Sequence, residues 1–200
     1  MEAGELRDRP GPLPVLSREV GFSGRVWDVV SEVVDLGVAG VVTRDYIDHP
    51  GAVAVLALDD DGRVALVQQY RHPIGTFEWE IPAGLTDVAG EPPLVTAQRE
   101  LAEETDLQAR VWHHLLDVAT TPGSSSETIG IYLARDLSEV PAADRHAREG
   151  EELGMPLAWF PLDTVREAAL AGRIHNMTLT VAVLAACAAR DAGWGTLRPA

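Results

Sequence analysis

Apolar residues recur along the chain with two different periods. Residues 52–70 read AVAVLALDDDGRVALVQQY, in which two apolar runs flank Asp61-Gly62. This dipeptide between two apolar runs is typical of a tight turn, so the pattern predicts a β-hairpin. The first run, 52–58, is apolar on both faces and therefore predicts a central strand. The second run becomes polar from Gln68 onward, which indicates that a site opens at its end.

A helical period follows at 94–105. At about 100° per residue, four residues form one narrow face: Leu94, Ala97, Leu101 and Thr105. Three carboxylates crowd the adjoining face: Glu100, Glu103 and Glu104. Like charges at these spacings oppose one another by roughly 0.2–0.5 kcal/mol per pair, and the only basic residue within a turn is Arg99.

The acidic face has two interpretations. A bare ExxEE run on a helix is more often a solvated surface than a site. A hard divalent cation such as Mg²⁺ or Mn²⁺ would reverse the repulsion, because carboxylate oxygens are its preferred ligands. The residues around the run therefore decide between the two.

The remaining elements complete the predicted fold. Strands are expected within 25–47, broken at Gly37 and Gly40, and again at 111–120, 128–135 and 157–162. Two further helices are expected at 162–170, capped by Asp163 or Thr164 and stopped by Gly172, and at 176–189. Strands bracketing an acidic helix and a buried helix predict an α/β fold, an α/β/α sandwich around a mixed sheet.

The domain organisation follows from the same pattern. Residues 1–15 are rich in proline and charge, which is typical of a flexible tail. Residues 16–48 are expected to form a small antiparallel β subdomain, and residues 49–200 the main domain. The strands at 25–47 are too short to hold a core of their own, so we expect this subdomain to pair with a second copy in a homodimer.

Charge and cysteine content exclude several classes of function. The net charge is −15, which argues against a nucleic-acid or acidic-membrane surface, so local cations must hold any polyanionic substrate. All sixteen basic residues are arginine, which excludes lysine Schiff-base chemistry and a Walker-type phosphate loop. The one cysteine, Cys187, lies in an apolar run and is expected to be buried. With no secretory pattern at the N-terminus and no run of eighteen apolar residues, a reducing cytoplasm is the expected compartment.

The sequence around the acidic helix resembles the signature of the Nudix hydrolases. That signature is a glycine, five residues, a glutamate, seven residues, then Arg-Glu-aliphatic-x-Glu-Glu-x-Gly-aliphatic. The matching residues are Gly84, Glu91, Arg99, Glu100, Leu101, Glu103, Glu104 and Leu107. There are two departures: six residues separate Gly84 from Glu91, and Asp106 stands in the place of the last glycine. An extra loop residue is thermodynamically mild, and aspartate tolerates the left-handed conformation that a helix C-terminus often needs.

A longer resemblance, over residues 20–190, is to the ADP-ribose pyrophosphatase branch of this family, most like its actinobacterial members. It is carried by QYR ending at Arg71, by WEIPAG at 79–84 and by Pro122, fifteen residues after Leu107. The resemblance implies hydrolysis of ADP-ribose to AMP and ribose 5-phosphate with two or three Mg²⁺ or Mn²⁺ ions. It also implies metal ligands at the backbone carbonyl of Ala83 and at Glu100, Glu103 and Glu104.

The same resemblance implies roles for further residues. Glu152 is the expected general base, chosen over Glu149 and Glu151 in the same acidic stretch. Arg71, which as a lone residue would more often form a surface salt bridge, is expected to orient the phosphates, and Arg99 to hold a signature carboxylate. The other expected substrate contacts are Trp79, Glu80, Gly84 and Pro122, with Trp27 and Tyr46 as candidates for stacking on adenine.

Two alternatives remain open on the sequence alone. The substrate could be another nucleotide sugar, such as GDP-mannose, because the residues that would contact the base are not identifiable. A non-catalytic module that senses ADP-ribose is the alternative from a different class. That reading usually requires a broken signature, whereas every carboxylate is present here.

Overall fold

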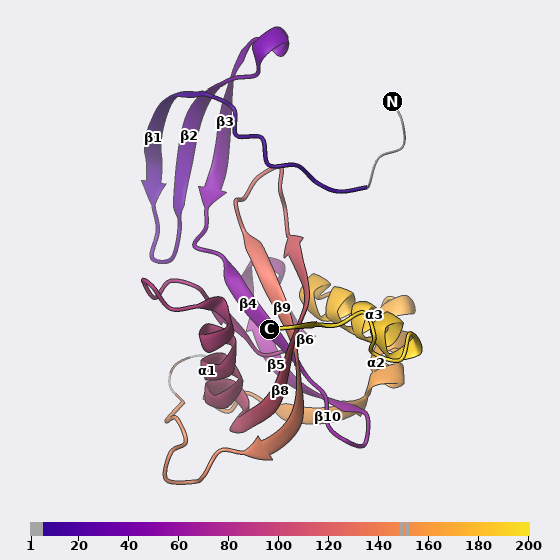
Figure 1. Ribbon diagram of the computed structural model, residues 1–200. Coiled ribbons are helices and arrows are strands. Elements are labelled where there is room, and N and C mark those ends of the chain that lie inside the picture. Colours follow the sequence, from indigo (N-terminus) through magenta and orange to yellow (C-terminus); the bar gives the residue numbers. More distant parts are fainter. Residues whose placement is uncertain (1–5, 149, 151–152) are drawn as a thin grey trace. The chain divides into compact units, whose positions relative to one another are not determined.

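The computed structural model describes residues 6–148, 150 and 153–200 (Figure 1). The chain divides into two compact units. The N-terminal unit extends to His49 and includes Thr121–Ser126, and the larger unit comprises Pro50–Thr120 and Glu127–Ala200. Thr121–Ser126 joins the N-terminal unit through backbone hydrogen bonds, since the Ile47 N–H donates to Ser124 O (2.9 Å) and the Ser126 N–H to Ile47 O (3.0 Å). The sequence pattern did not indicate this association.

The N-terminal unit is a three-stranded antiparallel sheet in the order β1–β2–β3. Its strands are β1 Val15–Ser23, β2 Asp28–Asp35 and β3 Val41–Asp48, with the 3₁₀ turn η1 Gly37–Ala39 between the last two. The predicted break is confirmed, because Gly37 and Gly40 adopt positive φ values of 66° and 88°. Strand β1 was not predicted; every one of its residues is exposed, so its sequence carries no core-facing apolar period.

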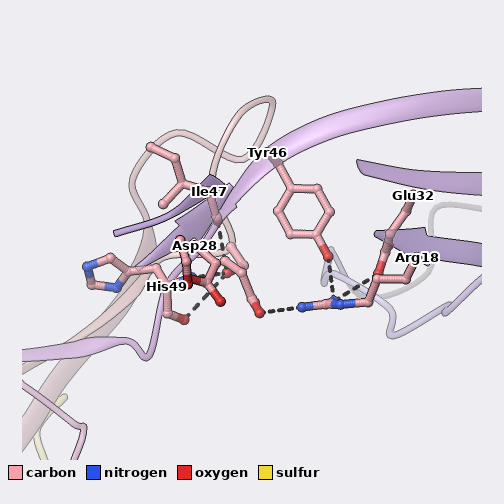
Figure 2. A network of polar contacts seen from close by, with 9 residues as sticks. Arg18, Asp28, Glu32, Tyr46, Ile47 and His49 are labelled. Carbon is pink, nitrogen blue, oxygen red and sulfur yellow. Dashed lines mark hydrogen bonds and ion pairs between the residues drawn. The ribbon is translucent and has the colours of Figure 1, made fainter. Parts of the chain in front are cut away.

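One ion network crosses this sheet from strand to strand. Arg18 on β1 donates to Glu32 on β2 (2.9 Å) and to the Tyr46 hydroxyl on β3 (3.2 Å), and it also pairs with Asp48. Figure 2 shows the Tyr46 hydroxyl directed at the Arg18 guanidinium. Burial and the charge of Glu32 together raise the pKa of Tyr46. The network ties the three strands together at their polar positions.

The larger unit holds two sheets and three helices. A five-stranded sheet has the order β11–β8–β9–β4–β7, and a three-stranded sheet has the order β10–β5–β6. The strands are β4 Ala52–Ala57, β5 Arg63–Arg71, β6 Thr76–Glu80, β7 Ala83–Leu85, β8 Leu107–Ala119, β9 Thr128–Glu139, β10 Leu157–Pro161 and β11 Arg198–Pro199. The helices are α1 Pro93–Thr105, α2 Leu162–Leu170 and α3 Met177–Asp191, with a 3₁₀ turn η2 His72–Ile74.

The predicted mixed sheet and layered sandwich are confirmed. Strand β4 pairs parallel with β9 and antiparallel with β7, which makes the sheet mixed and β4 central. Successive side chains of a strand point to opposite faces. One face of β4 packs with α1 in a cluster that includes Val53, Val55, Ala97 and Leu101. The other face packs with α2 and α3, in a cluster that includes Ala54, Leu56, Leu162 and Leu179 (Figure 1).

The predicted hairpin at Asp61-Gly62 is wrong beyond its turn. The turn forms, with Gly62 at a φ of 75°, but β4 and β5 are joined only by an isolated bridge between Leu58 and Val64. Past that bridge the two strands separate into different sheets. Both strands are apolar on two faces, so each can take its place between other elements instead of lying in one two-stranded ribbon.

The predicted cap of α2 is also wrong. Pro161, in an extended conformation, holds the N-cap position and makes no side-chain cap. The helix starts two residues earlier than a cap at Asp163 requires, and its first residue, Leu162, is buried at 2% exposure. Asp163 instead pairs from the first turn with Arg190 of α3 (3.0 Å). The expected start of α3 is confirmed, since the Asn176 side chain accepts the Leu179 N–H (2.9 Å).

Membrane insertion through a helix is not supported by the described part of the chain. None of its helices is both long and apolar enough to span a bilayer.

Candidate active site

Helix α1 presents its carboxylates beside the edge strand β7. It begins at Pro93, where a proline in the first turn costs no hydrogen bond because its N–H would have no helical partner. One face is buried through Thr96, Ala97, Leu101 and Thr105. The predicted apolar face is therefore confirmed for three of its four positions, and Leu94 packs against the same cluster from a partly buried position. The acidic side chains lie on the remaining surface of the helix.

Arg99 lies at the centre of the acidic face. One of its nitrogens, Nη1, donates to Glu100 Oε1 (2.6 Å) and to Glu103 Oε2 (3.0 Å), and Nη2 donates to Glu91 Oε2 (3.2 Å). Burial alone would lower the pKa of Arg99, but the bonds and charges of these carboxylates raise it above its ordinary value. The guanidinium thus offsets the repulsion that the sequence predicts.

Glu91 reaches Arg99 across the loop that contains the extra residue. The Thr96 hydroxyl donates to Glu91 Oε2 (2.8 Å). This bond, followed by the bond from Arg99, lowers the pKa of Glu91. Gly90, with a φ of 81°, takes the left-handed conformation that turns the chain just before Glu91. The longer loop therefore still delivers the glutamate to the arginine.

Strand β7 lies so close to α1 that residue 84 has no room for a side chain. A Cβ built on Gly84 would overlap the carboxylate of Glu100. One residue earlier, the Ala83 N–H donates to Glu104 Oε2 (3.2 Å). Residues Ala83 and Gly84 of β7 thus lie against the carboxylates of Glu104 and Glu100.

Arg71 and Glu80 form a bidentate pair across β5 and β6. Arg71 Nε donates to Glu80 Oε1 (2.7 Å) and Nη2 to Glu80 Oε2 (2.6 Å). The Glu80 side chain is 7% exposed and that of Arg71 is 44% exposed, so the acid is buried beneath an arginine that reaches solvent. A lone arginine would be expected to form a salt bridge at the surface. The partner of Arg71 is instead the buried carboxylate of Glu80, which fixes the plane of the guanidinium.

Trp79, expected at the substrate, packs partly into the core. Its ring meets Phe160 edge-on with the centroids 5.3 Å apart. It also lines a shallow hollow with Glu78, Arg173 and Asn176 on the side of the sheet that carries α2 and α3. The carboxylates of α1 are not among the residues that line this hollow.

Comparisons with known proteins agree with this geometry. A model of the NUDIX domain matches residues 48–179. An ADP-ribose pyrophosphatase of Mycobacterium tuberculosis is 43% identical over 170 residues, which are 85% of this chain and 81% of the relative. The chain belongs to the Nudix family. The methanol dehydrogenase activator of Bacillus methanolicus is 36% identical over 162 residues, 81% of this chain and 85% of that protein.

A solved structure supports the Nudix fold independently. The crystal structure of an ADP compounds hydrolase superposes with a TM-score of 0.73 at 22% identity, covering 94% of this chain and 99% of that chain. At this identity the likeness concerns the fold. It agrees with the mixed sheet between α1 and the pair α2 and α3.

Several predicted Nudix site residues belong to the N-terminal unit or lie outside the described residues. Trp27, Tyr46 and Pro122 belong to the N-terminal unit, so their role at the substrate stays a prediction. Trp27 is 44% exposed, and its ring lies 5.9 Å from that of His49. Glu152, and with it Glu149 and Glu151, lies outside the described residues.

The Nudix carboxylates suit a hard cation by their chemistry. Among the described residues, no group of three or more His, Cys, Asp or Glu side chains forms a ready metal cluster. Two of the signature carboxylates nevertheless converge within 3.0 Å of a single nitrogen of Arg99. A donor set made only of oxygens, already gathered about one positive charge, fits Mg²⁺ or Mn²⁺.

One contact of the site was missed from the sequence. Arg148 donates to the backbone carbonyl of Glu103 (3.0 Å) and to the carboxylate of Asp106 (2.8 Å). Asp106 ends α1 with a φ of 58°, which confirms the expected left-handed conformation. In the sequence, Arg148 is recognisable only as an arginine at the start of an acidic stretch, and such a residue has many possible partners.

Proposed function

We propose that this Nudix hydrolase cleaves the diphosphate of ADP-ribose with one water, giving AMP and ribose 5-phosphate. The observation that carries the proposal is the packing of the Glu100 carboxylate against Gly84, beside the Ala83–Glu104 bond. These contacts support a site formed by α1 and the edge strand β7, with every carboxylate of the signature present in the sequence. The similarity to an ADP-ribose pyrophosphatase over most of the chain supports this substrate.

Metal is part of the proposal. Nudix ADP-ribose pyrophosphatases depend on a divalent metal ion. Here Mg²⁺ or Mn²⁺, as two or three ions, would be held by the Ala83 carbonyl and by Glu100, Glu103 and Glu104. Such ions neutralise a diphosphate and lower the pKa of a coordinated water. Arg99 keeps Glu100 and Glu103 in position on the helix, since it bonds to both.

The other residues bind the substrate and move the proton. Arg71 orients the phosphates, because its guanidinium is held in one plane by Glu80 and a net charge of −15 leaves the diphosphate dependent on local cations. Glu80 supports Arg71 from a buried position. Glu152 takes the proton of the attacking water as general base.

A panel of nucleotide sugars tests the proposal. Purified protein with Mg²⁺ is given ADP-ribose, GDP-mannose and related diphosphates, and the products are identified by mass. AMP with ribose 5-phosphate as the preferred products supports the assignment, and preferred cleavage of GDP-mannose replaces it with the alternative substrate. EDTA should abolish turnover; binding of ADP-ribose that survives EDTA, in a protein that never turns over, would identify a sensor.

We also propose a homodimer in the cytoplasm that binds neither nucleic acid nor membranes. The N-terminal sheet exposes large apolar side chains that an isolated subunit would leave in water: Val15, Leu16, Val20, Phe22 and Val41. Light scattering at micromolar concentration should give a dimeric mass, and a monomer would contradict this. The reducing compartment is supported by Cys187, which is the only cysteine and is buried.

A further inference from the structure

An aspartate, Asp106, replaces the glycine at the end of the Nudix signature. Asp106 adopts a left-handed conformation, with φ 58° and ψ 25°, and its N–H donates to Ala102 O (3.0 Å). Glycine takes this conformation without strain, whereas aspartate only tolerates it. The carboxylate is therefore expected to make a contact that offsets this cost.

The structure shows two contacts at Asp106, one at each end of a distant segment. The Val140 N–H donates to the Asp106 carbonyl (2.8 Å). Eight residues later, Arg148 Nη2 donates to Asp106 Oδ2 (2.8 Å). Both ends of the segment 140–148 are thus hydrogen-bonded to Asp106. The backbone of one residue holds its start, and the side chain of the same residue holds its end.

Arg148 binds the metal-binding helix at a second point. Its Nε donates to the carbonyl of Glu103 (3.0 Å), one of the four carbonyls that a helix leaves without a partner at its C-terminus. An arginine there also interacts favourably with the negative end of the helix dipole. Glu103 is therefore fixed at its side chain by Arg99 and at its carbonyl by Arg148.

The ion pair is partly buried and its members depend on one another. The side chains of Arg148 and Asp106 are 29% and 23% exposed. The other oxygen of Asp106, Oδ1, is buried and has no hydrogen-bond partner in the described part of the chain. Removing Arg148 would leave a partly buried carboxylate without its cation, which costs more than losing an exposed pair.

Resting on the proposed function, we propose that Asp106 and Arg148 are positioning residues for diphosphate hydrolysis. The pair fixes the chain at Arg148 to the end of α1, directly before the acidic stretch Glu149–Glu152 in the sequence. Arg148 also bonds to the carbonyl of Glu103, so the pair steadies the last turn of the helix, which carries Glu103 and Glu104. Because catalytic geometry is sensitive to displacements of about 1 Å, loss of the pair should act on turnover.

The test compares three variants. Arg148→Gln and Asp106→Gly each remove the ion pair, and glycine keeps the left-handed turn. Each should lower kcat about 10–100-fold and raise the Mg²⁺ concentration needed for half-maximal activity, while KM stays within about twofold of the wild type. Arg145→Gln is the matched control. Arg145 lies in the same segment but bonds to Val140 O (3.0 Å) and Glu139 (2.7 Å) and not to Asp106 or Glu103, so its variant should turn over like the wild type.

A double variant and hydrogen exchange separate positioning from simple helix capping. Arg148→Gln combined with Asp106→Gly should cost no more kcat than Arg148→Gln alone, because Arg148→Gln already removes the ion pair that Asp106→Gly removes. Amide exchange in the last turn of α1 should be faster in both single variants and unchanged in Arg145→Gln. Lower thermal stability with wild-type kcat, additive losses, or an equal kcat loss in Arg145→Gln would each overturn the inference. If the wild type cleaves no nucleotide diphosphate, the proposed function fails, and the exchange measurement still tests the tether.

Discussion

The carboxylate of Glu100 occupies the space that a Cβ at residue 84 would need. The signature glycine is thus explained by a steric requirement at the point where β7 meets α1. Substituting it tests whether this close approach matters for the metal.

Gly84→Ala should displace Glu100 without unfolding the protein. Forcing an extra methyl into a packed site typically costs 1–3 kcal/mol, so the variant should remain folded with a lowered melting temperature. The Mg²⁺ concentration for half-maximal activity should rise about 10–100-fold, as when a ligand's supporting contact is lost. Gly195→Ala is the control, since its Cβ would meet only Ala192 O at 3.7 Å. An unchanged Mg²⁺ titration would argue against Glu100 as a ligand.

Glu104→Gln should abolish turnover and preserve the fold. The substitution removes a metal ligand and also one of the like charges on α1. Steady-state rates at saturating Mg²⁺ and circular dichroism check the two parts, with the exposed Glu167→Gln on α2 as control. More than a tenth of wild-type activity would contradict the metal assignment.

Arg71→Lys should weaken substrate binding despite conserving the charge. Lysine cannot reproduce the planar two-point contact with Glu80 that fixes the guanidinium. Charge-assisted hydrogen bonds contribute about 1.5–3 kcal/mol, so kcat/KM should fall about 10–100-fold. Arg110→Lys is the matched control, because Arg110 makes a similar two-point contact with Asp136 but is 80% exposed. Equal losses in both variants would point to a general effect of the substitution.

Glu152→Gln should lower kcat about 10²–10⁴-fold, the typical contribution of a general base. KM and the Mg²⁺ dependence should change little, because a base, unlike a ligand, does not hold the metal. Glu149→Gln and Glu151→Gln serve as comparisons and should be much milder. If Glu151→Gln causes the large loss instead, Glu151 is the general base. If all three variants are mild, the base lies elsewhere in the protein.

Asp163 should contribute an acid-sensitive part of the stability. The hydrogen bond from Arg190 lowers the pKa of Asp163 below its ordinary value of 3.8. A carboxylate whose pKa is lower in the folded than in the unfolded state stabilises the protein at pH values above its ordinary pKa. This contribution disappears as the pH falls through the pKa of the folded state. The melting temperature of Asp163→Asn should thus be lower than that of the wild type at pH 7, with the difference shrinking toward pH 2. Asp144→Asn is the control, and a difference independent of pH would contradict the linkage.

The sequence predicts local chemistry well where one element contains the whole signal. The acidic face of α1, its arginine and the left-handed Asp106 all lie within eight consecutive residues, so helical geometry alone brings them together. The layered sandwich could also be predicted, because strands that are apolar on both faces must be covered on both sides.

The features that the sequence did not predict depend on contacts between residues far apart in the chain. The turn at Gly62 was predicted, but the choice of different sheets by β4 and β5 depends on partners far along the chain. The two-point contact of Arg71 with Glu80 required the register of β5 on β6, in which Arg71 pairs with Thr76 and Val67 with Glu80. Arg148 required a tertiary contact across 42 residues. No local period contains such information.

The parallel pairing of β4 with β9 has a consequence for how the protein is made. Residues Ala52–Ala57 find their parallel partners at Ile129–Ala134, well after the signature helix has been synthesised. Chains grow from the N-terminus, and pairing at long sequence separation forms slowly. A nascent chain that ends near residue 120 already contains every signature carboxylate but lacks the strand that completes the sheet beneath them. The helix that carries the signature carboxylates is therefore synthesised before the strand that completes the sheet.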